Sequence, residues 1–303
     1  MSARRYRISH RTEYRYSDIV TSSYGRGFLM PTDSLRQRCL AYRLDIQPAP
    51  ADHSTSHDAY GNVSTYFHVT TPHQTLTITS DSIVDVDPPG RGLHTGGPAV
   101  QPWEAARPAG LKGALATEFT LDLNPPEITD EVREYAAPSF VPERPLVAVL
   151  RDLSSRIYND FTYHSGSTTV STGVSEVLTA REGVCQDFAR LAIACLRANG
   201  LAASYVSGYL ATNPPPGKDR MIGIDATHAW AAVWTPQPPG QFEWLGLDPT
   251  NNQMVDERYV IVGRGRDYAD VPPLRGIIYT NSKKSKIDVA VDVVPYEGDE
   301  LYA

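Results

Sequence analysis

The spacing of apolar residues restricts the fold of this chain more than any other feature of its sequence. In residues 4–16, Tyr and Ile side chains alternate with Arg, Ser and Glu, and a similar alternation returns at 40–46 and 63–69. A further strand-like stretch covers residues 76–86. A period of two is typical of a β-strand with one face toward solvent. Short strands separated by Gly, Pro, Asp and Asn therefore predict an antiparallel β-sandwich over residues 1–86.

A stretch dense in proline and glycine follows these predicted strands. Residues 87–126 include DPPGRGLHTGGP and, near their end, NPP. Proline and glycine interrupt helices and strands and are common where one domain ends and another begins. We therefore expect residues 87–126 to form a linker and residues 127–303 to form a second domain.

The second domain begins with a different apolar period. Leu146, Val149, Leu150, Leu153 and Ile157 have the spacing of an amphipathic helix. Further helices are predicted in TDEVREYAA, in SEVLTAREG and in CQDFARLAIACLRANG, the last of which ends at a capping glycine. Strands return in SYVSGYL, THAWAAVW, FEWLGLD, DERYVIVG and IDVAVDVV. Helices followed by antiparallel strands predict an α+β core that includes the carboxy-terminal strands.

Composition and charge argue against several classes of protein. Of the 303 residues, 41% are hydrophobic and 21% are charged, which is ordinary for a soluble globular protein. The formal net charge is −7 and no long basic tract occurs, so we expect no nucleic-acid partner. The first residues lack the apolar stretch of a secretory signal, and no later run is long enough for a bilayer. We therefore expect no membrane partner and a cytoplasmic location.

The three cysteines, Cys39, Cys185 and Cys195, are too few and too scattered for a disulfide framework. On one helix, Cys185 and Cys195 would lie about 15 Å apart along the axis, beyond the roughly 7 Å limit for a disulfide. The chain contains no CxxC spacing of the kind that binds metals. We therefore expect three free thiols, no bound metal and no cofactor.

Cys185 lies two residues after Gly183, at the first turn of a predicted helix. The free N–H groups and the positive dipole end of a helix stabilise a thiolate, and they can also stabilise a tetrahedral oxyanion. Cys185 is thus a candidate nucleophile whose own N–H is a candidate oxyanion donor. The alternative is a buried core cysteine, which fits Cys39 and Cys195 better. Taken alone, Cys185 leaves both interpretations open.

The segments THAWAAVW and FEWLGLD are separated by a Pro- and Gly-containing loop, which predicts an antiparallel pair of strands. A symmetric loop would place Trp230 opposite Gly246 and His228 opposite Asp248. Cross-strand neighbours have Cβ atoms about 4.5–5.5 Å apart, so the carboxylate could accept the imidazole N–H and fix its tautomer. A slip of one residue would put the two side chains on opposite faces. A solvated strand-end histidine and a turn aspartate before Pro249 are the alternatives.

Residues near these three have weaker assignments. Trp230 is expected on the same face as His228, either shielding the imidazole or filling the core. Asp187 is assigned a structural role, because in the first helical turn it favours the dipole but opposes a thiolate. Tyr209 and the loop NPPPGKDRMIG from Asn213 are expected either beside a substrate cleft or on an ordinary part of the molecule.

Three segments together resemble the signature of a known family. The transglutaminase-like superfamily has a papain-like core with Cys, His and Asp in this order, and its motifs resemble GVCQDFARLAIACLRANGLAASYVSGYL, THAWAAVW and WLGLDPTNN. The resemblance covers about residues 129–265, and residues 4–86 resemble the amino-terminal domain of bacterial members. It implies Cys185 as nucleophile, His228 as general base and acid, and Asp248 as the residue that orients the histidine.

The resemblance implies an enzyme that hydrolyses amide bonds of a peptide or protein substrate through a covalent thioester. Acyl transfer to an amine is the closest alternative. The remaining length has no counterpart of the carboxy-terminal β-barrels of animal transglutaminases, and no acidic loop resembles their calcium sites. We therefore expect a cysteine peptidase or amidase, with water as the acyl acceptor.

Two alternatives from other classes also stay open. An inactive binding or scaffold protein could keep the same fold, although a copy without activity would usually have lost one of the three residues. A metal hydrolase could use Cys185, His228 and Asp248 as zinc ligands, although no HExxH or CxxC pair supports it.

Overall fold

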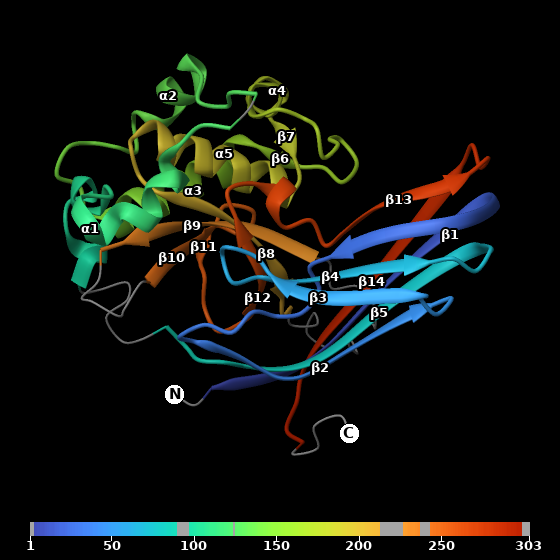
Figure 1. Ribbon diagram of the computed structural model, residues 1–303. Helices are drawn as coiled ribbons and strands as arrows, with labels where there is room; N and C mark the ends of the chain where they lie inside the picture. The colour runs from blue at the N-terminus through green and yellow to red at the C-terminus, as the bar shows by residue number, and fades with distance from the viewer. Residues whose placement is uncertain (1–2, 90–96, 124, 213–226, 237–242, 299–303) are drawn as a thin grey trace, which may run out of the picture.

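The computed structural model describes residues 3–89, 97–123, 125–212, 227–236 and 243–298. Figure 1 shows two parts that lie side by side, an extended antiparallel sheet and a second sheet covered by helices. The first part comes mainly from the amino-terminal end of the chain, and the second contains the helices. The predicted α+β class is therefore confirmed.

A seven-stranded antiparallel sheet forms the first part. Its strands are β1 (Arg4–Gly27), β2 (Gln37–Gln47), β3 (Asp52–His57), β4 (Val63–Val69), β5 (His73–Val86), β13 (Leu274–Thr280) and β14 (Ser285–Pro295). The long strand β1 pairs with β5 from Arg4 to Val20, with a register shift after Arg15, and with β4 from Ser23 onward. Ile78 of β5 and Phe67 of β4 belong to one buried cluster. The sheet thus folds over on itself and encloses a core between its two halves.

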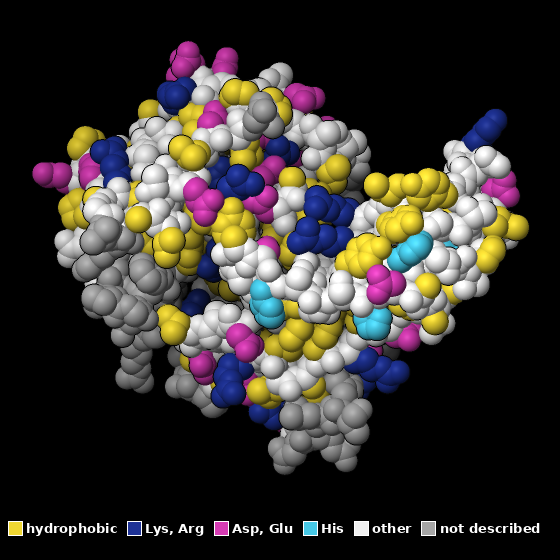
Figure 2. Space-filling view, in the orientation of Figure 1, with side chains coloured by type: hydrophobic (Ala, Val, Ile, Leu, Met, Phe, Trp, Pro, Cys, Tyr) yellow, Lys and Arg dark blue, Asp and Glu magenta, His cyan; other side chains and the backbone are white. Residues whose placement is uncertain are grey.

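The carboxy-terminal strands join this amino-terminal sheet, although the sequence analysis grouped them with the second domain. β14 pairs with the first half of β1, from Tyr6 with Pro295 to Tyr16 with Ser285, and β13 pairs with its second half. An alternating pattern identifies a strand but does not identify its partner, because partner choice depends on which sheet edge is within reach. β13 also exposes apolar side chains, among them Ile277. Figure 2 shows hydrophobic atoms in yellow gathered at the end of the sheet where β13 lies.

The stretch expected as a linker contributes to the core. Its described part forms the short helices η1 (Gly97–Val100), η2 (Trp103–Ala106), α1 (Gly110–Gly113) and η3 (Ala114–Thr120). Trp103 packs edge-on against Phe140 with ring centroids 5.1 Å apart, and Phe119 packs against Trp244 at 5.0 Å. Proline and glycine interrupt regular structure here, but the aromatic side chains between them are buried. This segment is therefore packed against the second part rather than a bare connection.

The second part contains the predicted helices and a five-stranded antiparallel sheet. The helices are α2 (Asp130–Ala136), α3 (Leu146–Asp160), α4 (Val174–Ala180) and α5 (Cys185–Ala198). The sheet has the order β11 (Gln253–Met254), β10 (Glu243–Asp248), β9 (Thr227–Thr235), β8 (Ala203–Leu210), β12 (Tyr259–Gly265). Smaller elements are the parallel pair β6 (Thr162–Tyr163) and β7 (Glu182–Gly183) and the turn η4 (Tyr268–Asp270). No helix among the described residues has both the length and the apolarity needed to span a bilayer.

Helix α5 is the central element that carries the site. Its apolar residues, including Leu191 and Cys195, are buried in the same cluster as Ala231 and Val233 of β9. The helix ends before Gly200, which has a φ of +76° and so adopts the left-handed conformation that favours glycine. Both the start and the end of this helix agree with the sequence prediction. The helix packs against β9, and Cys185 in its first turn lies beside His228 at the beginning of that strand.

The two parts share buried contacts at their junction. Ile8 of β1 belongs to the same core cluster as the helices. His10 Nδ1 lies 2.9 Å from the Tyr209 hydroxyl, and the two rings meet edge to face with centroids 5.7 Å apart. Tyr209 is almost completely buried in this junction. The suggestion that it borders a substrate cleft was therefore wrong, because its hydroxyl bonds to the amino-terminal sheet.

Candidate active site

The amino-terminal end of α5 is fixed by side chains around its first turn. Asp187 accepts the backbone N–H of Val184 at 2.9 Å, and the Thr168 hydroxyl donates to the same carboxylate oxygen at 2.6 Å. A carboxylate that caps a helix in this way also complements its dipole. The structural role expected for Asp187 is confirmed by these bonds. They hold Cys185, the first residue of α5, in a defined position.

The first turn of α5 supplies backbone donors beside the Cys185 thiol. The N–H groups of Asp187 and Phe188 bond to the Val184 carbonyl at 3.0 and 3.1 Å. The backbone N–H groups of Cys185 and Gln186 come before these two, and at such positions an α-helix offers no carbonyl of its own as acceptor. The Cys185 side chain is partly exposed. This end of the helix can therefore accommodate negative charge on the sulfur or on a group bound next to it.

His228 and Asp248 lie on adjacent antiparallel strands and bond directly. His228 is the second residue of β9, and Asp248 is the last residue of β10. His228 Nε2 lies 2.7 Å from Asp248 Oδ2. The Asp248 side chain is completely buried, and the His228 side chain is 11% exposed. The structure thus confirms the neighbouring antiparallel strands and brings the two side chains into contact.

The register of the two strands differs from the prediction by two residues. Gly246 lies opposite Ala232 rather than Trp230, so Asp248 stands diagonal to His228. The assumption of a symmetric connecting loop was therefore wrong. A shift of two residues keeps every side chain on its predicted face, because side chains alternate with a period of two. Diagonal neighbours also stay within reach of long side chains, which is why the contact forms.

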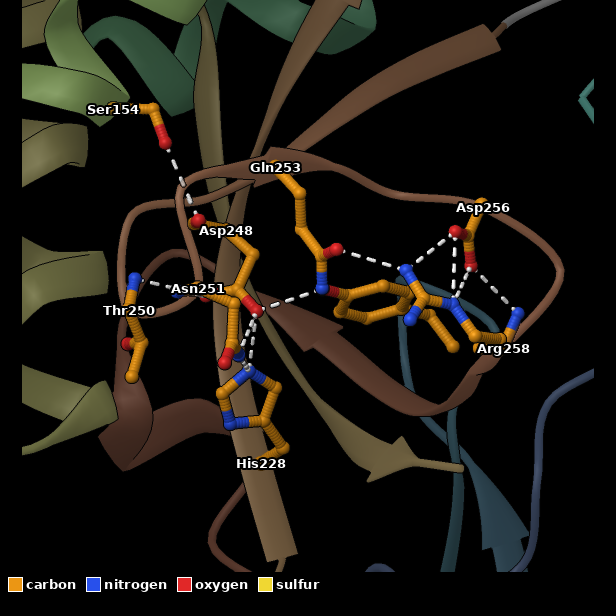
Figure 3. A network of polar contacts seen from close by, with 9 residues as sticks. Ser154, His228, Asp248, Thr250, Asn251, Gln253, Asp256 and Arg258 are labelled. Carbon is orange, nitrogen blue, oxygen red and sulfur yellow. Dashed lines mark hydrogen bonds and ion pairs between the residues drawn. The ribbon is translucent and has the colours of Figure 1, made fainter. Parts of the chain in front are cut away.

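The Asp248 carboxylate is surrounded by donors. Its Oδ2 accepts hydrogen bonds from His228 at 2.7 Å, Asn251 at 2.6 Å and Tyr259 at 2.8 Å, and its Oδ1 accepts the Thr250 N–H at 2.9 Å. Figure 3 shows the labelled residues of this group converging on Asp248. Burial alone raises the pKa of Asp248, but the bonds from His228 and the other donors lower it below its ordinary value. Asp248 is therefore a carboxylate at neutral pH.

A second row of contacts holds Tyr259 in place. Its hydroxyl accepts a hydrogen bond from Gln253 Nε2 at 2.5 Å, and Gln253 Oε1 accepts one from Arg258 at 2.8 Å. Arg258 is in turn bound by Asp256 at 2.7 Å. Figure 3 shows this row extending from Gln253 to Arg258. The Tyr259 hydroxyl is thereby directed to donate its single proton to Asp248.

Sequence reasoning missed Asn251 and Tyr259. Asn251 follows Asp248 closely in WLGLDPTNN, and Asx side chains often bond within a turn, so turn chemistry offered a signal for it. Tyr259 lies on β12, at the opposite edge of the core sheet from β11. No local pattern links it to Asp248, and β9 and β8 lie between their two strands. The contact forms because Tyr259 packs over this face of the sheet with Trp230 and Val206.

The protonation of His228 depends on both of its neighbours. Burial lowers the pKa of the imidazole, but the hydrogen bond and charge of Asp248 and those of Cys185 outweigh burial and raise it to about 10. Because Nε2 is bonded to Asp248, Nδ1 is the nitrogen available to the Cys185 sulfur. The arrangement therefore favours an imidazolium beside the Cys185 sulfur.

Trp230 forms a wall beside His228. Their ring centroids lie 6.0 Å apart, and the Trp230 ring meets Tyr259 at 5.2 Å. Gly208 lies opposite His228 on β8, and a Cβ at this glycine would approach the indole to 2.7 Å. The absence of a side chain there leaves room for the ring. Trp230 is 1% exposed, so it both fills the core and shields the imidazole.

Two tyrosines stand near the thiol. Burial and then the charge of Cys185 raise the pKa of Tyr163 and of Tyr205. Tyr205 is buried, whereas Tyr163 is 55% exposed and can meet a bound molecule. Neither residue was singled out from the sequence. The loop NPPPGKDRMIG from Asn213 lies outside the described residues.

Comparisons with known families match both parts of the chain. Residues 6–85 match the bacterial transglutaminase-like N-terminal region, and residues 133–249 match the transglutaminase-like superfamily. The second match includes Cys185, His228 and Asp248. The first match lies within the amino-terminal sheet, and the second covers helices α3 to α5 and strands β8 to β10 of the other part.

Related proteins occur in mycobacteria. Uncharacterized proteins of Mycobacterium bovis and Mycobacterium tuberculosis are 83% identical over 299 residues, which cover 99% of this chain and 95% of theirs. An uncharacterized protein of Mycobacterium leprae is 32% identical over 300 residues, covering 95% of this chain and 98% of its own. The similarity to these proteins therefore extends over both parts.

A solved structure shares the fold. The crystal structure of a proposed cysteine protease from Cytophaga hutchinsonii superimposes with a TM-score of 0.70. The alignment covers 99% of this chain and 95% of that chain at 19% sequence identity. The common architecture thus includes the amino-terminal sheet as well as the helical part.

Proposed function

The chain belongs to the transglutaminase-like superfamily, and we propose that it is a thiol-dependent amide-bond hydrolase acting on peptides or proteins. Members of this superfamily are usually cysteine peptidases or acyltransferases, which makes a papain-like thiol enzyme the general class. The observation that carries the proposal is the buried 2.7 Å bond from His228 to Asp248, with Cys185 beside the same imidazole. In this proposal Cys185 is the nucleophile, His228 the general base and acid, and Asp248 the orienting carboxylate.

The first half of the proposed reaction forms a thioester. The Cys185 thiolate attacks the amide carbonyl carbon, and the carbonyl oxygen becomes an oxyanion. The N–H groups of Cys185 and Gln186 are positioned to stabilise this oxyanion at the start of α5. His228 then gives its Nδ1 proton to the amide nitrogen, the C–N bond breaks, and the amine leaves. Asp248 stabilises the imidazolium before this transfer and fixes its orientation throughout.

The second half releases the acid. His228, now neutral, takes a proton from water as the water oxygen attacks the thioester carbonyl. The C–S bond breaks, the carboxylic acid departs, and the thiolate and imidazolium are restored. A primary amine in place of water would give a new amide instead. We propose water as the acceptor.

The geometry also bears on the zinc alternative. A zinc ion would require His228 and Asp248 to direct a nitrogen and an oxygen at a common centre about 2 Å from each. Instead Asp248 Oδ2 receives donors from three side chains, including a direct bond from His228. This arrangement supports an orienting carboxylate rather than a metal ligand.

The proposed activity is tested with a mixed-sequence peptide library in water enriched in ¹⁸O and containing an excess of a primary amine. The wild-type chain is compared with Cys185→Ser and with the matched control Cys39→Ser. Mass spectrometry then distinguishes ¹⁸O-labelled acids from amine adducts. We expect labelled acids from the wild type and from Cys39→Ser, and none from Cys185→Ser.

Other outcomes would contradict specific parts of this proposal. A dominant amine adduct would identify an acyltransferase and overturn the choice of water. Equal products from Cys185→Ser would show that another group is the nucleophile. A wild-type chain that cleaves nothing in the library would argue against peptide hydrolysis.

A further inference from the structure

A small pocket lies between the core sheet and the segment that leads into β2. Its lining includes Trp230 of β9, Trp244 of β10 and Arg264 of β12, and also Leu35 and Arg36 from the segment before β2. Its volume is about 80 Å³. The pocket thus combines aromatic walls with two arginines, and it takes no part in the contacts around the Asp248 carboxylate.

Arg264 is held rigidly at this pocket. Its backbone N–H donates to Asn62 Oδ1 at 2.7 Å, and its carbonyl accepts from Asn62 Nδ2 at 2.7 Å. The guanidinium carbon lies 4.9 Å from the centre of the Trp244 ring. The Arg264 Nε is buried and has no hydrogen-bond acceptor in the described part of the chain. Asn62 therefore fixes the backbone of Arg264, the Trp244 ring packs against its guanidinium, and the Nε retains an unused donor.

Arg36 and Arg264 bring positive charge to the pocket. Burial, and then the neighbouring charge of Arg36, lower the pKa of Arg264 to about 10. Among the described residues, no carboxylate contributes to the shift in the pKa of Arg264. Burying a cation is unfavourable unless an anion compensates it. An anionic group in the pocket would supply that compensation and accept the Nε proton.

We propose that this pocket binds a carboxylate group and, resting on the proposed function, that the carboxylate belongs to a peptide substrate. The planar guanidinium matches a carboxylate through two parallel hydrogen bonds. A water molecule takes up roughly 30 Å³ in the liquid, so the pocket has room for a carboxylate and a short stem. The indole rings of Trp230 and Trp244 suit an aliphatic stem.

Trp230 connects the pocket to the candidate active site. It lines the pocket, and its ring lies 6.0 Å from the ring of His228. Ala232, which also lines the pocket, is four residues beyond His228 on β9, or ~13 Å at the rise of a strand. An extended peptide covers that distance in about four residues. The bound carboxylate would therefore lie a few residues from the amide bond at Cys185.

The test measures binding without turnover, in the full-length chain carrying Cys185→Ala. Tryptophan fluorescence is recorded against N-acetylglutamate α-amide, whose single carboxylate is on the side chain, and against its neutral isostere N-acetylglutamine α-amide. N-acetylalanine supplies a terminal carboxylate, and inorganic phosphate a different anion. We expect a saturable change in fluorescence with the two carboxylates only. Comparing the affinities of N-acetylglutamate α-amide and N-acetylalanine shows whether the pocket prefers a side-chain or a terminal carboxylate.

Variants locate the response. Arg264→Gln should weaken carboxylate binding at least about tenfold, because it removes the charged donor of the proposed hydrogen bonds. The control Arg151→Gln, at an exposed arginine of α3, should bind as tightly as the parent. If Arg264→Gln does not fold, Arg264→Lys keeps the charge but loses the planar fork, and it should bind several-fold more weakly.

The inference is overturned if the glutamine and glutamate derivatives give the same response, if phosphate binds as tightly as the carboxylates, or if neither Arg264 variant weakens binding. These results are independent of the proposed activity. If the chain binds carboxylates through Arg264 but cleaves no peptide, the carboxylate pocket is supported and the proposed hydrolase activity is contradicted. If the chain cleaves peptides but does not bind the carboxylates, the hydrolase activity is supported and the carboxylate pocket is contradicted.

Discussion

His228 donates its Nε2 proton to Asp248 across a diagonal of the β9–β10 pair, not between residues directly opposite each other. The diagonal position leaves Oδ2 of Asp248 open to Tyr259 on one side and to Asn251 on the other. The carboxylate is thus fixed by three side chains from different parts of the chain. This arrangement makes the effect of each partner separately measurable.

Asp248→Asn should lower the turnover of the fastest-cleaved peptide at least about tenfold while the chain stays folded. Both carboxylate oxygens accept hydrogen bonds, so the amide nitrogen of asparagine would meet a donor in either orientation. The imidazolium would also lose its counter-charge. Turnover and circular dichroism are compared with Asp130→Asn, at a side chain that is 94% exposed. Wild-type turnover in Asp248→Asn would show that Asp248 does not orient the histidine.

Tyr259→Phe tests the role of the hydroxyl alone. It removes the 2.8 Å bond to Asp248 and leaves the ring packed against Trp230. We expect turnover to fall by roughly tenfold, since a hydrogen bond to a charged group contributes about 1.5–3 kcal/mol. The acid limb of the pH profile should move to higher pH, because this hydroxyl helps to lower the pKa of Asp248.

The matched control for this variant is Tyr135→Phe, which removes a 3.0 Å bond from a tyrosine of α2 to Asp160. It should change stability without moving the pH profile. If both variants give the same profile as the wild type, the Tyr259 hydroxyl serves stability only and does not position Asp248.

Iodoacetamide at pH 6 should alkylate Cys185 much faster than the other two thiols. Burial raises the pKa of Cys39 to about 11 and that of Cys195 to about 12, so both are protonated at this pH. Cys185 is partly exposed and lies beside the His228 imidazolium at the start of α5, a position typical of reactive thiols. Peptide mapping gives the three rates, and His228→Ala should slow only the reaction at Cys185. Equal rates in the folded wild type would remove the evidence for an activated thiol.

The local pattern of the sequence was sufficient for most elements but not for their partners. The strand expected at residues 63–69 coincides with β4, and α5 covers the helix expected from Cys185 to the capping Gly200. Those features depend on neighbouring residues, which a sequence shows directly. The pairing of β14 with β1 and the register of β9 with β10 depend on contacts between distant segments. No periodicity encodes such contacts.

The candidate site shows the same division. Cys185, His228 and Asp248 stand out because each ends or begins an element in a recognisable segment, and the structure brings His228 and Asp248 into contact. Tyr259 has no comparable signal, because aromatic residues are common in strands and do not by themselves indicate a functional role. Its contact with Asp248 arises from side-chain packing over one face of the core sheet, where Tyr259 meets Trp230.

The His228–Asp248 pair also predicts how stability depends on pH. The pKa of His228 is raised from 6.5 to about 10, so its stabilising contribution is complete below about 6.5 and is lost as the pH rises through 10. The pKa of Asp248 is lowered from 3.8, so its contribution is complete above 3.8 and is lost as the pH falls below that value. This pair therefore contributes most between pH 3.8 and 6.5.

His228→Gln should remove the alkaline part of that dependence. Unfolding midpoints in urea are measured at pH 6.5 and 9.5 for the wild type, for His228→Gln and for the control His53→Gln, at an exposed histidine of β3. Each pKa unit between the folded and unfolded imidazole corresponds to about 1.4 kcal/mol, so the wild type and His53→Gln should lose more stability over this interval than His228→Gln. Tyrosines and other thiols titrate alike in all three chains, and their effects cancel in the comparison. Equal losses in the three chains would mean that His228 gains no proton affinity on folding, and the imidazolium assumed in the proposed reaction would then lack its physical basis.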